Sequence, residues 1–379
     1  MKLIKYLKIF VINILIILIL LIIFDSLLNF RYSETKINNI VSSDDDLLSR
    51  RSYNIREYIP NLDRYVIPSK NYLSEAKTLE NKKYRIRTNN DGFIIGEQNI
   101  NLDKNKIDII FFGGSTTNCL YVDEDKRFPY LVQKTLNREL NNDIQILNAG
   151  VYGKTSMLST MDLITKGLKN NPEIVFLMHN INDFSVLEKS GKYWDAPISR
   201  SLIKQKIHIE ALSSSNFFIR TFYVLTPNIY YIINRFFEIL LNNKPNDEFI
   251  EYRNSEKIDK KIIFQEYIKS IKTFIAIAKI YEIEVVLMTQ FNRMNIDDEY
   301  IVQLNSEIKN FEEYIYVYDQ LNNLVREIAN EENINLIDLD LLLPQNENYI
   351  YDEVHLNNNG SIFVADLISN FLIENYYNK

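Results

Sequence analysis

The carboxyl-terminal part of the chain places an aspartate three residues before a histidine. Asp352 and His355 lie within one turn of each other, so the carboxylate can hold the imidazole Nδ1–H and leave Nε2 free to take a proton from a serine. The other two histidines of the chain, His179 and His208, have no comparable partner in the sequence: His179 lacks an orienting carboxylate, and His208 has only Glu210 nearby. His355 is therefore the predicted general base.

A candidate nucleophile for this base follows a short apolar segment in the first third of the chain. Ser115 comes directly after Gly113 and Gly114, which allow a tight turn at the end of a buried strand. A helix that begins there would direct backbone N–H groups toward an oxyanion. A glycine-rich strand end can also be a simple turn, so Ser115 alone does not define a site.

Two further segments combine glycine and asparagine in the same kind of position. The segment Asn148–Ser156 contains two glycines, whose N–H groups can reach a substrate oxygen without interference from a side chain. The segment His179–Asp183 contains Asn182, whose side-chain amide can donate a second hydrogen bond to an oxyanion or, alternatively, cap a helix.

The elements that must position these residues alternate in type. Short apolar segments predict strands, and amphipathic segments between them predict helices. The predicted strands are 107–112, 144–147, 173–178, 284–289 and 334–338, and the predicted helices are 128–139, 157–169, 262–281, 305–331 and 360–375. This alternation predicts a parallel sheet with helices on both faces, where ligands bind beyond the carboxyl ends of the strands. All four segments described above fall at these strand ends.

The order and placement of the four segments resemble the SGNH (GDSL-type) hydrolases, over about residues 107–375. The resemblance implies a three-layer, flavodoxin-like α/β fold with Ser115 as nucleophile and Asp352 orienting His355. It also implies an oxyanion hole made by the N–H of Gly153, the side chain of Asn182 and the N–H of the nucleophile. Two positions depart from the family pattern: a glycine, Gly114, stands where aspartate is common, and Asn180 stands where glycine is usual. The Gly-Gly-Ser-Thr-Thr form, with an apolar amino terminus and an Asn-x-x-Gly-Phe turn upstream, is similar to envelope-associated members.

Composition excludes several other functions. The 43 basic and 50 acidic side chains give a net charge of −7, without the positive field that nucleic-acid binding requires, so we expect no nucleic-acid partner. The single cysteine, Cys119, forms no disulfide within the chain, and no Cys/His cluster suggests a zinc site. No phosphate-binding motif of the Walker type is present, and we expect neither a metal nor another cofactor.

The first residues predict a membrane anchor over residues 1–31. Lys2, Lys5 and Lys8 precede an apolar segment, 9–24, that is interrupted only by Asn13. A cleaved signal peptide is the alternative, but residues 25–31 lack a small-x-small cleavage site. With the lysines in the cytoplasm, a single span would place the rest of the chain outside the membrane.

The remaining chain is expected to form a linker and one catalytic domain. Residues 32–100 predict a linker with a small β element, in which a strand near 84–90 ends in a turn at Asp91-Gly92. Residues 101–379 predict the SGNH hydrolase domain, with a helical insertion at about 184–261. Within it, charged residues in the apolar segment 217–241 argue against a second span and favour amphipathic helices.

These observations predict a serine esterase that acts on O-acyl esters, most simply O-acetyl esters, of cell-surface glycans or lipids. The same residues would serve an O-acyltransferase if a sugar hydroxyl, rather than water, accepted the acyl group. A non-catalytic protein that binds glycan in the same cleft is the alternative outside enzymology. The expected partners are thus an acylated carbohydrate or lipid, and the membrane through the amino-terminal helix.

Overall fold

The computed structural model describes residues 2–27, 56–96, 107–194, 217–233 and 258–377, apart from residues 77, 228, 231, 232, 307 and 309. The chain divides into two compact units: Met1–Tyr53 with Ile203–Asn254, and Asn54–Leu202 with Ser255–Lys379. Large parts of the predicted linker at 32–100 and of the predicted insertion at 184–261 lie outside the described residues. The second unit contains all the predicted site residues.

In the first unit, the described helices are α1 (Lys2–Leu27) and α8 (Phe217–Leu225). The carboxylate of Asp25 is buried and accepts a hydrogen bond from the backbone N–H of Ile229 at 2.7 Å. α8 confirms a helix in part of the predicted amphipathic segment. Among the described residues, no helix has the length and apolar character needed to cross a membrane. The membrane-spanning anchor expected over residues 1–31 is thus not found in the described structure.

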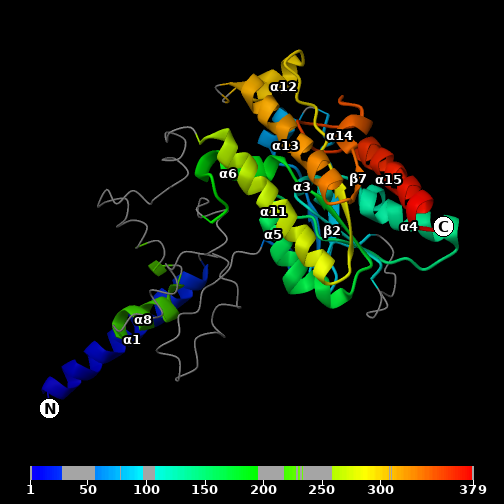
Figure 1. Ribbon diagram of the computed structural model, residues 1–379. Coiled ribbons are helices and arrows are strands. Elements are labelled where there is room, and N and C mark those ends of the chain that lie inside the picture. The colour runs from blue at the N-terminus through cyan, green and yellow to red at the C-terminus, as the bar shows by residue number, and fades with distance from the viewer. Residues whose placement is uncertain are drawn as a thin grey trace. The chain divides into compact units, whose positions relative to one another are not determined.

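The second unit is built on a five-stranded sheet in which every neighbouring pair is parallel (Figure 1). The strand order is β4-β3-β5-β6-β7, which is the flavodoxin-like order 2-1-3-4-5 when the five strands are counted along the chain. The strands are β3 (Ile109–Gly113), β4 (Ile146–Asn148), β5 (Ile174–Met178), β6 (Glu284–Met288) and β7 (Asn335–Ile337). The α/β fold with a parallel sheet is as predicted.

Helices cover both faces of this sheet, as expected for strands that are apolar on both sides. One face packs against α5 (Ser156–Asp162), α6 (Ile181–Ser190), α11 (Lys260–Ile280) and α13 (Phe311–Glu331), and its core includes Phe112, Leu177 and Leu287. The other face packs against α4 (Phe128–Leu140) and α15 (Asn358–Leu372), around Phe111, Phe176 and Val286. Alternate residues of each strand thus enter two different cores.

The remaining described elements are short. They are α2 (Lys70–Glu75), α3 (Ser115–Asn118), α12 (Glu299–Leu304), α14 (Leu339–Leu342), the 3₁₀ turns Glu124–Lys126 and Leu168–Asn170, and the π-helical turns Leu163–Gly167 and Ile373–Tyr377. The helix predicted over 305–331 is confirmed as α13 from Phe311 onward, but its predicted start at residue 305 is too early. Asn305 ends α12, and the side chain of Asn310 accepts a hydrogen bond from the Glu313 N–H to start α13.

The segment before β3 contains the predicted small β element. β1 (Asp63–Val66) pairs antiparallel with β2 (Tyr84–Arg87), and the predicted turn is present, with Gly92 at φ 76°. The element is attached to the second unit: Phe93 is fully buried in the sheet core, and the N–H of Ile94 donates to the carbonyl of Asn148 at 2.9 Å.

Candidate active site

The structure brings Ser115, His355 and Asp352 into one hydrogen-bonded series. The Oγ of Ser115 lies 2.8 Å from Nε2 of His355, and Nδ1 of His355 lies 2.6 Å from Oδ2 of Asp352. Ser115 is partly exposed, the His355 side chain is 25% exposed, and Asp352 is buried. The predicted nucleophile and base are therefore accessible from solvent, while the carboxylate of Asp352 is shielded from water.

A compact turn holds the histidine against its carboxylate. Oδ1 of Asp352 accepts the backbone N–H groups of Val354 and His355, at 2.9 and 2.8 Å. The Tyr351 ring stacks on the His355 imidazole, with centroids 5.7 Å apart and planes 14° apart. These contacts leave Oδ2 of Asp352 free to face Nδ1.

The electrostatics of this group suit a general base. Burial disfavours the charged imidazolium, but the Asp352 carboxylate outweighs burial and raises the pKa of His355 above its ordinary value. Burial acts to raise the pKa of Asp352, but His355 and the donated hydrogen bonds hold it below its ordinary value. Asp352 therefore stays ionised, and His355 loses its proton at a higher pH than a free imidazole does.

A tyrosine far away in the sequence also contacts this carboxylate. The O–H of Tyr72, in α2, donates to Oδ2 of Asp352 at 2.8 Å, the same oxygen that faces Nδ1 of His355. Sequence reasoning missed Tyr72, because it lies 280 positions from Asp352 and no local pattern connects the two residues.

The turn that carries Ser115 explains the two glycines before it. A Cβ on Gly113 would lie 2.0 Å from Oγ1 of Thr117, and one on Gly114 would lie 2.4 Å from Nδ2 of Asn182. An aspartate at position 114, as the family pattern has it, would collide with Asn182 in this arrangement. Gly114, which departs from the family pattern, thus allows the side chain of Asn182 to pack directly against its backbone.

Asn182 and the loop that contains Gly153 are adjacent. Nδ2 of Asn182 donates to the carbonyl of Lys154 at 3.0 Å, which leaves the second N–H of the amide available. Gly153 has φ 69°, a backbone conformation that favours glycine. The contacts of Gly114, Asn182 and Lys154 therefore bring the three predicted parts of the oxyanion hole to one place, while their roles stay predictions.

A buried ion pair anchors the Gly153 loop. The ammonium group of Lys154 is fully buried, binds the carboxylate of Asp162, and donates to the Ala149 carbonyl at 3.3 Å. Burial lowers the pKa of Lys154, while the charge of Asp162 opposes this shift. Lys166 lies 3.7 Å from the same carboxylate.

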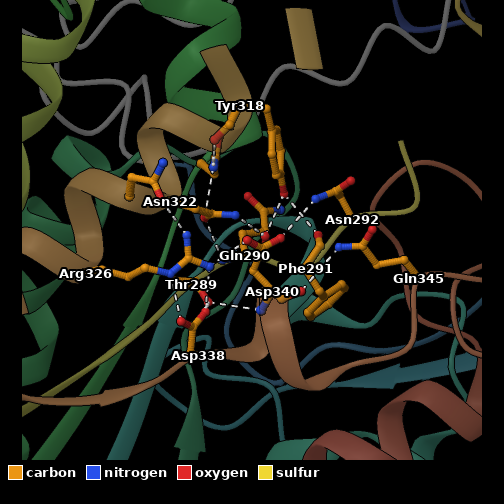
Figure 2. A network of polar contacts seen from close by, with 12 residues as sticks. Thr289, Gln290, Phe291, Asn292, Tyr318, Asn322, Arg326, Asp338, Asp340 and Gln345 are labelled. Carbon is orange, nitrogen blue, oxygen red and sulfur yellow. Dashed lines mark hydrogen bonds and ion pairs between the residues drawn. The ribbon is translucent and has the colours of Figure 1, made fainter. Parts of the chain in front are cut away.

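A polar network surrounds Gln290 and Asn322 (Figure 2), and it also holds the turn before Asn182. Oδ1 of Asn322, in α13, accepts from the Gln290 N–H at 3.1 Å and from Nδ2 of Asn180 at 3.0 Å. Nδ2 of Asn180 also donates to the Tyr318 carbonyl at 2.9 Å. Asn180, the second departure from the family pattern, thus ties the β5–α6 turn to α13, which a glycine could not do.

Gln290 connects this network to the nucleophile turn. Its Oε1 accepts the N–H of Ile181 at 3.0 Å, and its Nε2 lies 3.3 Å from Oγ1 of Thr116. Ile181 precedes Asn182, and Thr116 follows Ser115. Sequence reasoning missed Gln290; the only signal was its place just after the predicted strand at 284–289.

The structure also contains a second serine, histidine and aspartate group. Nε2 of His179 lies 2.8 Å from Oγ of Ser159, and Nδ1 lies 3.5 Å from Oδ2 of Asp183. All three side chains are buried. Burial lowers the pKa of His179 to about 3, and burial raises the pKa of Asp183 to about 6. The partner that His179 lacked in sequence reasoning is thus Asp183, one helical turn away.

Comparisons with known proteins give overlaps in structure alone. No family model matches the chain, and no curated protein matches it. An acetyl xylan esterase overlaps 70% of this chain and all of its own, at 19% identity and a TM-score of 0.40. The lipase/acylhydrolase from Enterococcus faecalis overlaps 70% of this chain and 95% of its own, at 14% identity and a TM-score of 0.41. A mutant of the acetyl-xylooligosaccharide esterase Axe2 from Geobacillus overlaps 71% of this chain and 94% of its own, at 16% identity and a TM-score of 0.41. Overlaps of this quality do not establish that the chain shares the activities of these enzymes.

Proposed function

We propose that this chain is a serine esterase of the SGNH type that cleaves O-acyl esters. The observation that carries the proposal is the hydrogen-bonded series from Ser115 Oγ through His355 to Asp352, at 2.8 and 2.6 Å. This series lies at the carboxyl end of a parallel sheet, where α/β enzymes bind their substrates.

In the proposed reaction, Oγ of Ser115 attacks the ester carbonyl as Nε2 of His355 accepts its proton. The N–H of Gly153, the amide of Asn182 and the N–H of Ser115 stabilise the resulting oxyanion. The alcohol leaves with the proton from His355, and an acyl ester remains on Ser115. Water then attacks this ester with His355 as base, which releases the carboxylic acid.

The proposed substrates are O-acetyl esters of cell-surface glycans or lipids. This choice is supported by the sequence resemblance and by the location expected from the amino terminus. If a sugar hydroxyl replaces water in the second half of the reaction, the same residues perform acyl transfer. The two outcomes differ only in the acceptor of the acyl group.

The cellular location is a separate proposal that the sequence alone supports. Lysines 2, 5 and 8 before the apolar segment 9–24 favour a single-pass protein with its catalytic unit outside the cytoplasm. Fractionation followed by protease treatment of intact cells tests this: we expect the chain to sediment with membranes and to be digested from outside. Recovery in the soluble fraction, or protection until the cells are lysed, would contradict the proposal.

Hydrolysis of p-nitrophenyl acetate by the full chain tests the proposed chemistry. We expect Ser115→Ala and His355→Ala each to lower kcat by at least about 10³-fold, as for other serine hydrolases. The matched controls are Ser159→Ala and His179→Gln, in the second group, which should keep turnover in the fraction that folds.

Labelling by a fluorophosphonate identifies the nucleophile independently of turnover. Label should disappear in Ser115→Ala and persist in Ser159→Ala, because Ser159 is buried. Labelling without acetate hydrolysis would favour transfer to a specific acceptor. An unlabelled and inactive chain would sink the esterase proposal.

A further inference from the structure

Arg56 holds a guanidinium group in a fixed position next to Tyr152. Its Nη1 donates to the Tyr152 carbonyl at 3.1 Å, and its guanidinium carbon lies 5.2 Å from the centroid of the Tyr152 ring. Arg56 is partly exposed, and Tyr152 is 53% exposed. The two contacts restrict the guanidinium while solvent, or a ligand, can still reach it.

This guanidinium lies directly against the predicted oxyanion loop. A Cβ built on Gly153 would be 1.8 Å from Nη1 of Arg56, so the arginine occupies the space beside the Gly153 backbone. The next residue, Lys154, has its carbonyl 3.3 Å from the position of a Cβ on Gly114, the neighbour of Ser115. Arg56 thus lies beside the backbone of the Gly153 loop, and the next residue of this loop, Lys154, accepts a hydrogen bond from Asn182 at 3.0 Å.

The charge of Arg56 has no carboxylate partner within the part of the chain that the structure describes. The hydrogen-bond acceptor of its guanidinium there is the Tyr152 carbonyl. By contrast, Arg85, Arg87 and Arg326 each bind a carboxylate. An arginine has five N–H donors in a planar fork that matches carboxylate and phosphate groups. Among the described residues, one of these donors of Arg56 binds the Tyr152 carbonyl, and the fork geometry of the guanidinium suits an anionic ligand.

We propose that Arg56 forms an anion subsite of the Ser115 site and binds a carboxylate or phosphate on the alcohol part of the substrate. The inference rests on the proposed esterase function and narrows its substrate class to acyl esters of acidic molecules. A group bound there would hold the ester near Ser115 through its unreacting part, which aids orientation. The subsite supplies no group to the chemical step, so Arg56 is a specificity residue.

Direct binding to the full chain tests the subsite without any need for turnover. Ligand-observed NMR titrations at constant ionic strength would use D-glucuronate as the carboxylate probe, glycerol 3-phosphate as the phosphate probe and D-glucose as the neutral control. We expect at least one anion to bind more tightly than glucose, and Arg56→Gln to weaken that anion about 10- to 100-fold, the range for a charge-assisted hydrogen bond. Arg56→Lys, which keeps the charge but loses the fork, should give an intermediate value.

The matched control is Arg64→Gln, which removes the same charge from an exposed position on β1. It should leave anion binding unchanged, and circular dichroism should show all variants folded. Binding by glucuronate alone assigns a carboxylate, and binding by glycerol phosphate alone assigns a phosphate. If Arg56→Gln and Arg64→Gln weakened anion binding equally, the effect would be a general one of charge, and the subsite would be overturned. Anions that bind no better than glucose would overturn it as well.

Turnover separates this inference from the proposed function. Acetate release from an O-acetylated polyuronate and from an O-acetylated neutral xylan gives a ratio of kcat/KM values. If the carboxylate binds, Arg56→Gln should lower this ratio about 10-fold or more. A change that affects the polyuronate and the xylan equally cancels in the ratio. An active chain whose ratio is unchanged keeps the esterase function and loses the subsite. Anion binding without Ser115-dependent turnover keeps the subsite and loses the esterase function.

Discussion

At the scale of single residues, burial separates two groups of the same composition. Ser115, His355 and Asp352 form a series in which the serine and the histidine are partly exposed, whereas Ser159 and His179 are enclosed in the core beside Asp183. The pKa of His355 is raised and that of His179 is lowered to about 3, because only His355 faces a carboxylate that outweighs burial. A pattern of residue types therefore does not identify a nucleophile until exposure is known.

The hydrogen bond from Tyr72 predicts how the pH dependence should change. Its O–H withdraws negative charge from the oxygen of Asp352 that faces His355, so its loss should strengthen the hold of Asp352 on the imidazolium. In Tyr72→Phe, the pKa of His355 should rise. The proposed reaction needs neutral His355, so activity decreases as the pH is lowered. In Tyr72→Phe this decrease should begin at a higher pH than in the unaltered chain.

The measurement is the pH profile of kcat/KM for p-nitrophenyl acetate. Tyr121→Phe is the matched control. The Tyr121 ring lies 5.6 Å from that of Tyr72, but the hydrogen bond to Asp352 comes from Tyr72. Tyr121→Phe should leave the acid limb in place. A Tyr72→Phe profile that shifts to lower pH, or equal shifts in both variants, would contradict this role for Tyr72.

At the scale of elements, three strand ends must keep a fixed relation for the predicted oxyanion hole to exist. Gln290, after β6, joins the turn after β5 at Ile181 to the turn after β3 at Thr116. Asn322, on α13, binds Gln290 (Figure 2) and also accepts a hydrogen bond from Asn180. The network therefore connects the positions of the nucleophile turn and of Asn182.

Gln290→Met should affect both activity and stability. The loss of its Oε1 leaves the Ile181 N–H without its partner, which costs about 1–3 kcal/mol of unfolding free energy. It also loosens Asn182, so kcat should fall about 10-fold with little change in KM, since the substrate contacts remain. Urea unfolding and steady-state kinetics measure the two effects.

A control for this prediction lies at the far end of the same network. Arg326 binds Asp338 and Asp340, each at 2.7 Å, and within the described residues neither Ser115 nor Asn182 is among the partners of its guanidinium group. Arg326→Met should lower stability and leave kcat unchanged in the folded fraction. If both variants lose kcat in proportion to stability, Gln290 has a structural role only.

At the scale of the whole molecule, the segment before β3 belongs to the same compact unit as the proposed active site. It contributes Tyr72 to Asp352, Arg56 to the Gly153 loop and Phe93 to the core. A fragment that starts at residue 54 should therefore fold and hydrolyse p-nitrophenyl acetate, whereas one that starts at residue 107 should lose cooperative thermal unfolding and activity. An active fragment from residue 107 would show that this segment is dispensable.

The sequence by itself determined the features that depend on local order along the chain. The alternation of apolar and amphipathic segments predicted the five strands of the sheet and most helices, because the side-chain periods of the two structures differ. It also predicted the turn at Gly92, and it placed Ser115 at the end of a strand; His355, by contrast, follows β7 only after α14 and a further segment. The helix predicted over 305–331 begins later than expected, at Phe311, because the side chain of Asn310 caps α13 at a position that amphipathic periodicity alone does not mark.

Only the tertiary structure decided which distant side chains meet and which are buried. Tyr72 and Asp352 are 280 positions apart, and Arg56 contacts a loop 96 positions later, so no spacing rule relates them. The partner of His179, Asp183, lies one helical turn away and could have been predicted from the sequence. The burial of the two residues could not. Contacts of this kind depend on how helices and loops pack on a sheet, and packing is a property of the assembled fold.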